Sequence, residues 1–269
     1  MMRIITVSTY PPIECGIATY TQWLRRSLHA PPTTVMTVVA PPGAAGDDVF
    51  PIYEPDNPTS LERIQNLLSQ RRPDIIHIQH EYGLFGTNRG SAILDLLALF
   101  RRAELPIVTT LHTVNTTPDT LQSQLLKRIV DEPSRVIVHE GFQRLQISQF
   151  LEGKTAEKID VIEHGIRSVE RPPHPKQRLG WTKQKVVLLC GYIRPRKAFH
   201  CIVDLFPDIV AAVPNATLVI ASKLRRPGEF VDYYHSLLAQ IKNSPCADHI
   251  SVVTGELPHD QIDTLISAA

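Results

Sequence analysis

The stretch DIIHIQH at residues 74–80 decides the fold class, because its apolar, β-branched side chains fall on both faces of an extended chain. A strand that is apolar on both faces is typical of a parallel sheet covered by helices on each side. Similar runs recur along the whole sequence. The predicted strands span 3–8, 34–40, 74–80, 107–112, 135–138, 159–162, 186–190, 217–221 and 250–254.

Helical patterns separate these runs and complete a strand–helix–strand order. The predicted helices span 17–29, 60–71, 89–102, 120–132, 141–151, 198–213, 229–243 and 258–268. Alternation of this kind indicates a parallel sheet with right-handed crossovers. The fold class predicted from the sequence is therefore α/β.

A proline-rich stretch interrupts this alternation and divides the chain. Arg171–Gln177 contains three prolines, which we expect to exclude helix and sheet. We predict an N-terminal domain at 1–168, a linker or hinge at 169–185 and a C-terminal domain at 186–269. The second domain has only three predicted strands, and the sequence stops inside a predicted helix. We therefore expect a truncated chain with an incomplete second domain.

Composition excludes several classes of protein. The 28 Lys and Arg residues are balanced by 27 Asp and Glu residues, so the net charge of +1 gives no reason to expect nucleic-acid binding. The four cysteines form no C-x-x-C pair, which favours a reducing compartment. The sequence shows neither a signal peptide nor an apolar run of membrane-spanning length. We expect a cytoplasmic protein, with peripheral contact to a membrane left open.

The first strand leads into a loop that could bind an anion. The segment TYPPIECGIATY at residues 9–20 places Gly16 at the start of a predicted helix. Glycine allows close approach of a ligand to the backbone, and the helix start offers unpaired N–H groups. The alternative is an ordinary loop with a glycine at the helix start. No G-x-G-x-x-G occurs, so no dinucleotide cofactor is predicted.

The strands at 74–80 and 107–112 both end in polar residues at the carboxyl edge of the predicted sheet. Gln79, His80 and Glu81 end the first, and His112 ends the second. A metal site at this edge is not favoured, because strand positions 77 and 80 point to opposite faces. His112 could hydrogen-bond to a sugar hydroxyl or a phosphate, or it could be satisfied by nearby loop carbonyls.

The segment GYIRPRKA at residues 191–198 places three cations between a strand and a helix. Arg194, Arg196 and Lys197 would oppose the positive end of the helix macrodipole. A bound anion such as a diphosphate would resolve this conflict, since arginine forks onto phosphate oxygens. The alternative is a solvated basic turn.

Taken together, these segments resemble the retaining "group 1" glycosyltransferases of GT-B fold. The similarity is carried by residues 10–20, by HIQHEYG at 77–83, TLH at 110–112, IEHG at 162–165 and GYIRPRK at 191–197. The resemblance implies a GT-B-like architecture of two Rossmann-like parallel-sheet domains that face each other across a cleft.

The resemblance also implies roles for individual residues. It places Gly16 beside the donor phosphates, and it makes His112 the catalytic-site residue that contacts the donor sugar near the reacting carbon. Arg194 and Lys197 would clamp the diphosphate, with Arg196 as a further candidate for phosphate binding. Metal and cofactors are not normally required in this family.

Four further residues are candidate contacts to the acceptor or substrate, namely Tyr10, Gln79, His80 and Glu81. The sequence also departs from the family pattern. Ala198 stands where the family usually has a glycine after the lysine. The family's pair of glutamates, which holds the nucleotide ribose, would lie beyond residue 269.

We therefore expect a glycosyltransferase that moves a sugar, with retention, from a UDP- or GDP-sugar to a saccharide or lipid-linked acceptor. Because of the missing segment, the family's activity carries over more safely to a full-length parent than to these 269 residues, and inactivity of this fragment stays open. Two alternatives stay open: a non-catalytic binding or assembly module, and a GT-B-like sugar-nucleotide epimerase. Association of copies is open as well, because an incomplete sheet would expose an edge.

Overall fold

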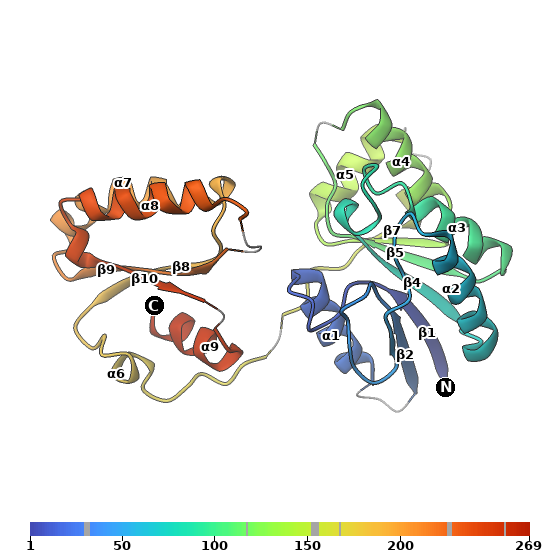
Figure 1. The fold of residues 1–269 in the computed structure, drawn as a ribbon, viewed down its shortest axis with the longest axis horizontal. Helices are drawn as coiled ribbons and strands as arrows, with labels where there is room; N and C mark the ends of the chain where they lie inside the picture. Colours follow the sequence, from blue (N-terminus) through green and yellow to red (C-terminus); the bar gives the residue numbers. More distant parts are fainter. Residues whose placement is uncertain (30–32, 117, 152–155, 167, 225–227, 256) are drawn as a thin grey trace. The chain divides into compact units, whose positions relative to one another are not determined.

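The computed structural model describes residues 1–29, 33–116, 118–151, 156–166, 168–224, 228–255 and 257–269. The chain forms two compact units, Met1–Arg167 (unit 1) and Ser168–Ala269 (unit 2) (Figure 1). Each unit contains a parallel sheet with helices packed against it. Among the described residues, no helix combines the length and the apolar character needed to span a membrane.

Unit 1 is built on a seven-stranded parallel sheet in the order β3-β2-β1-β4-β5-β6-β7. Its strands are β1 (Met2–Val7), β2 (Thr34–Val39), β3 (Val49–Phe50), β4 (Ile75–His80), β5 (Ile107–Leu111), β6 (Arg135–Val138) and β7 (Ile159–Val161). Six of these were expected. The short β3, which pairs Val49 with Val38 of β2, was missed because two residues carry no periodic pattern.

The helices of unit 1 follow the predicted order closely. They are α1 (Gly16–His29), α2 (Pro58–Arg71), α3 (Ile93–Arg102), α4 (Thr120–Asp131) and α5 (Gly141–Phe150), with one-turn 3₁₀ helices η1 (Tyr82–Leu84) and η2 (Ala156–Lys158). Local chemistry sets several starts. At the start of α2, the Asn57 side chain accepts a hydrogen bond from the Thr59 amide, and Pro58 occupies the first helical position. At the start of α4, Asp119 and Gln122 form a capping box.

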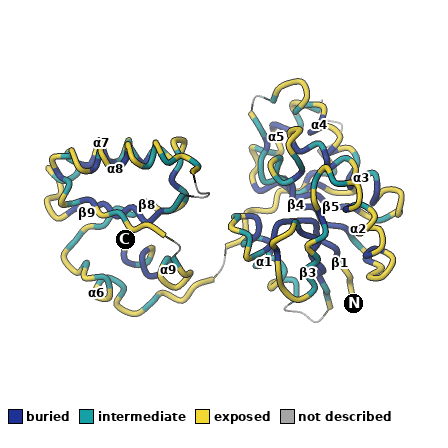
Figure 2. The backbone as a smooth tube through the Cα atoms, viewed as in Figure 1, coloured by how far each residue is buried: buried dark blue, intermediate teal, exposed yellow. Residues whose placement is uncertain are grey.

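Two apolar clusters lie on the two faces of the sheet. Figure 2 shows the buried residues of unit 1 along strands such as β4 and β5. The larger cluster joins Ile76 and Ile78 of β4 to apolar residues of α2, α3 and α4. The smaller cluster joins Met36 and Val38 of β2 to Leu24 and other residues near α1. Since alternate strand residues face opposite sides, α1 covers one face of the sheet and α2–α4 cover the other.

The strand order of unit 1 creates a switch point between β1 and β4. The chain leaves β1 toward β2 on one side, and it leaves β4 toward β5 on the other. The connections therefore diverge at the carboxyl ends of these two strands. Open α/β sheets bind ligands at such a point, so the fold directs attention to this edge.

Unit 2 contains a three-stranded parallel sheet in the order β10-β9-β8. Its strands are β8 (Lys185–Tyr192), β9 (Ala216–Lys223) and β10 (Ile250–Thr254), and its helices are α6 (Pro175–Arg178), α7 (Phe199–Ala212), α8 (Val231–Asn243) and α9 (His259–Ala268), with η3 (Pro195–Lys197) and η4 (Ala247–His249). Helices α7 and α8 lie on one face of the sheet and α9 on the other (Figure 1).

The sequence-based expectation for the proline-rich stretch is wrong at one place. Prolines were expected to exclude helix between 169 and 185, yet Pro175 begins the short α6. Proline is tolerated at the first helical position, where its missing N–H has no intrahelical partner to lose.

The backbone at Ala198 explains why glycine would suit this position. Ala198 lies in the left-handed region, with φ of 54° and ψ of 33°, between η3 and α7. A side chain at this conformation costs about 1–2 kcal/mol, part of which alanine regains by restricting the unfolded chain.

We expect Ala198→Gly to raise the free energy of unfolding of unit 2 by about 0.5 kcal/mol, because glycine removes this strain. Urea unfolding followed by Trp181 fluorescence in a Trp23→Phe background measures unit 2 alone. The matched control is Ala211→Gly in the same α7, which should destabilise the unit by up to about 1 kcal/mol. A loss of stability in both variants would contradict the strain at Ala198.

Candidate functional site

Three histidines and one tyrosine come together at the carboxyl edge of the unit 1 sheet. His112 follows β5, His139 follows β6 and His164 lies beyond β7. The ring centroid of Tyr20, on α1, lies 5.1 Å from that of His112 and 5.6 Å from that of His139. It lies 4.8 Å from that of His164. The His139 ring is 5.0 Å from each of the other two imidazoles. We call His112, His139 and His164 the histidine cluster.

Hydrogen bonds to carbonyl oxygens orient each imidazole. His112 Nε2 lies 2.7 Å from the Gln79 side-chain oxygen, and His139 Nδ1 lies 3.0 Å from the Ile162 carbonyl. His164 Nδ1 lies 2.9 Å from the carbonyl of Gly165. Since a carbonyl oxygen only accepts, each of these ring nitrogens donates. In the neutral rings the opposite nitrogen therefore carries a lone pair.

A row of polar side chains supports the histidine cluster from the sheet. His77 Nε2 lies 2.9 Å from the Thr110 hydroxyl. Each of these residues lies two positions before its counterpart in the contact between Gln79 and His112, and therefore further from the edge of the sheet. Beyond the strand ends, the Thr113 hydroxyl donates to a carboxylate oxygen of Glu81 at 2.5 Å. Gln79 lies on the same side of β4 as His77, and its side-chain oxygen orients His112.

Burial keeps the imidazoles of His77, His112 and His139 neutral. It lowers the pKa of His112 to about 3, with further lowering from His139, His164 and His77. Burial also lowers the pKa of His77 to about 4, and it lowers the pKa of His139 with a smaller effect from His164. At neutral pH the buried rings therefore offer both a donor and an acceptor and carry no charge.

His80 occupies the opposite side of β4 from Gln79. Its ring stacks on Phe85 of the larger apolar cluster at 5.5 Å and meets the edge of Tyr82 at 4.9 Å. Burial lowers the pKa of His80 to about 3, and neither ring nitrogen has a hydrogen-bond partner among the described residues. Tyr10 lies in the smaller apolar cluster, with the Arg25 guanidinium 5.8 Å from its ring centroid.

A pocket of about 320 Å³ opens beside the histidine cluster. One wall is residues 164–166. The other wall is α1, which contributes Gly16, Thr19, Tyr20, Trp23, Leu24 and Ser27. A Cβ atom added at Gly16 would meet no atom within 4 Å, so the fold leaves the space above this residue open. Trp23 is half-buried in this wall.

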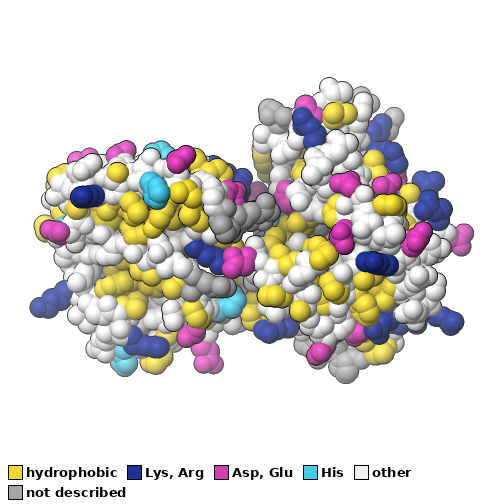
Figure 3. Space-filling view, in the orientation of Figure 1, with side chains coloured by type: hydrophobic (Ala, Val, Ile, Leu, Met, Phe, Trp, Pro, Cys, Tyr) yellow, Lys and Arg dark blue, Asp and Glu magenta, His cyan; other side chains and the backbone are white. Residues whose placement is uncertain are grey.

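The basic turn lies in unit 2, at the carboxyl end of β8. Arg194 is half-buried with its guanidinium 5.8 Å from the Tyr192 ring centroid, and its Nε atom is buried without a hydrogen-bond partner in the described chain. Arg196 and Lys197 belong to η3 and are exposed. Positive and negative side chains on the visible face of the molecule are otherwise intermixed (Figure 3).

Sequence reasoning assigned no role to Tyr20, His139 or His164. A signal was present, because a histidine follows or ends each of four successive strands: His80, His112, His139 and His164. Carboxyl ends of parallel strands share one edge, so this recurrence predicts a histidine-rich edge. Within the described ranges, no group of three or more His, Cys, Asp or Glu residues is arranged to hold a metal ion.

The buried histidines make the stability of unit 1 depend on pH. Their pKa values are lowered in the folded state, so the unfolded chain takes up protons first, below about pH 6.5. Stability is complete above this range and is lost as the pH falls toward the folded values of about 4 for His77 and about 3 for His112.

We expect the free energy of unfolding to fall by up to about 1.4 kcal/mol per pH unit for each buried imidazole below about pH 6. Urea unfolding read by Trp23 fluorescence in a Trp181→Phe background measures this slope. His77→Gln should reduce the slope by one proton, whereas His235→Gln, at an exposed position, should leave it unchanged. An unchanged slope in His77→Gln would contradict the neutral, buried state of that ring.

Comparison with solved structures confirms the expected fold. The chain aligns over its full length with Anabaena Alr3699/HepE in complex with UDP-glucose, at 16% identity and a TM-score of 0.65, covering 72% of that chain. Sucrose-phosphate synthase from Thermosynechococcus elongatus aligns at 15% identity and a TM-score of 0.66. The alignment covers 100% of this chain and 74% of the synthase chain. The catalytic domain of starch synthase IV from Arabidopsis thaliana, bound to ADP and acarbose, aligns at 12% identity and a TM-score of 0.66. The alignment covers 100% of this chain and 77% of that chain.

At these identities the structural likeness establishes the fold alone. Comparison with curated protein sequences gives no match. The family is shown by sequence, since the model described as Glycosyltransferase Family 4 matches residues 16–170, more than half of the chain. This match includes Gly16, the carboxyl ends of β2 to β7 and the histidine cluster. The chain therefore belongs to Glycosyltransferase Family 4 and is a glycosyltransferase of GT-B fold.

Proposed function

We propose that this glycosyltransferase moves a sugar from a nucleoside-diphosphate donor, a UDP- or GDP-sugar, to a hydroxyl of a saccharide or lipid-linked acceptor. Family membership supports the transfer reaction. Structural neighbours with UDP-glucose or ADP bound support a nucleotide in the donor. The basic turn at Arg194–Lys197 is the observation that carries the proposal.

In the proposed reaction the bond from the anomeric carbon to the phosphate oxygen breaks, and a bond to the acceptor oxygen forms. The nucleoside diphosphate leaves with the electron pair, and the acceptor hydroxyl proton passes to the leaving phosphate or to solvent. We propose retention of the anomeric configuration, on the basis of the resemblance to the retaining family.

The basic turn suits the charge that develops on the leaving group. Its three cations precede α7, where they oppose the helix macrodipole. The buried Nε of Arg194 lacks a hydrogen-bond acceptor among the described residues, which a phosphate oxygen would supply. Arginine donates in a fork and lysine adds a point charge, so Arg194 and Lys197 are the proposed diphosphate ligands, with Arg196 beside them.

In unit 1 the proposal assigns phosphate contact to the backbone at Gly16 and sugar contact to His112. The start of α1 offers free N–H groups beneath open space, which suits an anion. His112 is neutral, and its Nε2 donates to Gln79, so its Nδ1 can accept from a donor-sugar hydroxyl. Gln79 acts in this scheme as a positioning residue for His112.

Removal of either proposed diphosphate ligand should weaken nucleotide binding. We expect Arg194→Ala and Lys197→Ala each to lower the affinity for UDP or GDP by about 10- to 100-fold, since hydrogen bonds between charged groups contribute about 1.5–3 kcal/mol. Isothermal titration calorimetry with UDP, GDP and ADP measures the loss. The control is Lys185→Ala, an exposed lysine at the opposite end of the same strand.

Two results would reject the proposal. One is the absence of heat with all three nucleotides in the unsubstituted chain. The other is an equal loss of affinity in Lys185→Ala, which would indicate a general effect of charge and not a site at the basic turn.

Gly16 permits a test that separates binding from folding. We expect Gly16→Ala to keep or slightly raise stability, by about 0.5 kcal/mol, because alanine favours the helix and its Cβ meets open space. Nucleotide affinity should fall at least about tenfold if phosphate approaches this backbone. Gly141→Ala is the matched control, because Gly141 begins α5 with equally open space. Full affinity in Gly16→Ala would remove Gly16 from the phosphate site.

A further inference from the structure

A second pocket of unit 1, with a volume of about 210 Å³, lies near the switch point at the carboxyl end of β1. Three of its lining residues, Val7, Tyr53 and Phe85, belong to the larger apolar cluster, so the pocket borders the core of the unit. The remaining lining residues are Ser8, Thr9, Pro41, Pro55, Gly83 and Leu84.

Buried polar atoms without hydrogen-bond partners gather at this pocket. Thr9 and Tyr53 line it, and each is only 5% exposed. Neither hydroxyl has a partner among the described residues, and the same holds for both ring nitrogens of His80, which is completely buried. Folded proteins pair almost all of their buried polar groups, with protein atoms or with ordered water. Four unpaired atoms around one pocket therefore point to a ligand.

His80 adjoins the pocket through two contacts. Its ring stacks on Phe85, which lines the pocket, with 5.5 Å between the ring centroids. Val7 of β1 and Ile78 of β4 are partners in the register of the sheet, and Thr9 and His80 each follow two positions later. These two residues therefore lie at the ends of neighbouring strands. The unpaired polar atoms thus come from the ends of β1 and β4 and from the segment after β3 that contains Tyr53.

The chemistry of these groups favours a neutral ligand that both donates and accepts hydrogen bonds. Burial, with a smaller effect from His112, lowers the pKa of His80 to about 3, and burial raises the pKa of Tyr53. At neutral pH the His80 ring therefore has one donor and one acceptor nitrogen, and the Tyr53 hydroxyl keeps its proton. Neither side chain offers a charge to an ion. Water donates and accepts, and at about 30 Å³ per molecule several molecules fit this volume.

We propose that this pocket binds a cluster of ordered water molecules, which hydrogen-bond to Thr9, Tyr53 and His80 and join the three segments that carry them. Water held by several buried polar groups is part of the structure. The backbone carbonyl of His80 accepts from the His112 amide at 3.0 Å, so the strand end that the water holds also supports His112. This inference goes beyond the proposed function and does not depend on it.

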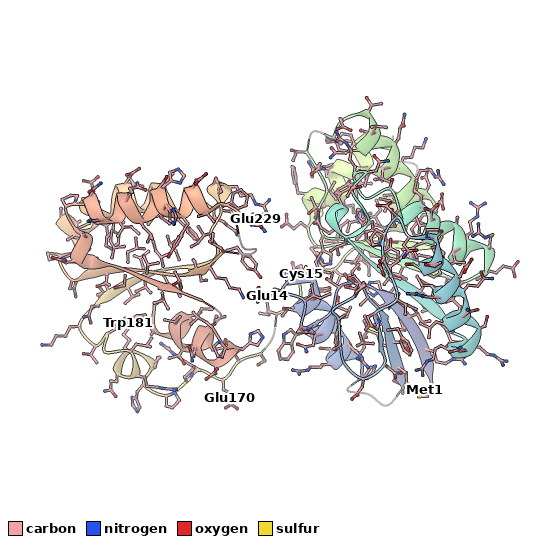
Figure 4. All side chains as sticks on the ribbon, viewed as in Figure 1. Met1, Glu14, Cys15, Glu170, Trp181 and Glu229 are labelled. Atoms are coloured by element: carbon pink, nitrogen blue, oxygen red, sulfur yellow. The ribbon has the colours of Figure 1, made fainter. Side chains whose placement is uncertain are left out.

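The sign of one stability change tests whether the Tyr53 hydroxyl is paired. Trp181, labelled in Figure 4, is the tryptophan of unit 2, so in a Trp181→Phe background Trp23 reports unit 1 alone. If water pairs the hydroxyl, Tyr53→Phe removes a hydrogen bond and should raise the equilibrium constant of urea unfolding by about 3- to 10-fold. If the hydroxyl is unpaired, the substitution relieves a desolvation penalty. A lower or unchanged constant would overturn the proposal.

The bound water can be detected directly by magnetic relaxation dispersion of the water oxygen nucleus, which senses buried molecules that exchange slowly with the solvent. The double variant Thr9→Val/Tyr53→Phe should hold fewer long-lived water molecules than the unsubstituted chain. The control is Tyr233→Phe, since the Tyr233 hydroxyl lies 3.0 Å from His200 Nδ1 and has a protein partner. It should leave the number unchanged. Equal numbers in the double variant and the unsubstituted chain would overturn the proposal.

The same variants test whether one cluster joins both hydroxyls. Where two groups share bound water, loss of the first already disturbs the water that the second binds. We therefore expect the double variant to raise the unfolding constant by less than the product of the two single fold-changes. A combined change equal to that product would show independent sites and would overturn the single cluster.

Discussion

The hydrogen bond of 2.7 Å between Gln79 and His112 is the contact on which the unit 1 site depends. It joins the ends of β4 and β5, and the contact between His77 and Thr110 repeats the same link deeper in the sheet. Both links lie on one face, while the other face of these strands packs into the larger apolar cluster. The sheet can therefore hold polar side chains at its edge without opening its core. Because the linked imidazoles are buried, they stay neutral, and this neutrality decides which ligands the site can accept.

The two units differ in the charge of the side chains at the ends of their strands. In unit 1 the strand ends carry the neutral rings of His112 and His139, which suit hydroxyl groups, together with the Glu81 carboxylate, which accepts from Thr113. In unit 2 the end of β8 carries Arg194, Arg196 and Lys197, which suit phosphate. A nucleotide sugar contains both kinds of group. The proposed function thus draws on two chemically different sheet edges.

The sequence predicted the order of elements well, because strands covered on both faces are runs of apolar residues that alternate with helical patterns. It missed β3, whose two residues are held by their neighbour β2 and not by a pattern of their own. It also gave no sign that Trp23, on α1, lines a pocket. The opposite wall comes from residues 164–166, far away in the sequence, and only the folded chain shows that a pocket lies between them. Gln79 and His112 were recognised as edge residues, but their pairing required the register of β4 and β5.

The carbonyl groups that hold the protons of His139 and His164 belong to Ile162 and Gly165, a short way before the boundary at Arg167. The tautomers of the two rings are therefore tied to the path of the connecting segment. A rotation of the backbone there would withdraw an oxygen from one nitrogen and allow its proton to move to the other. The polarity of the hydrogen bonds that the two rings offer is therefore set by two peptide groups of the backbone and not by the side chains around them.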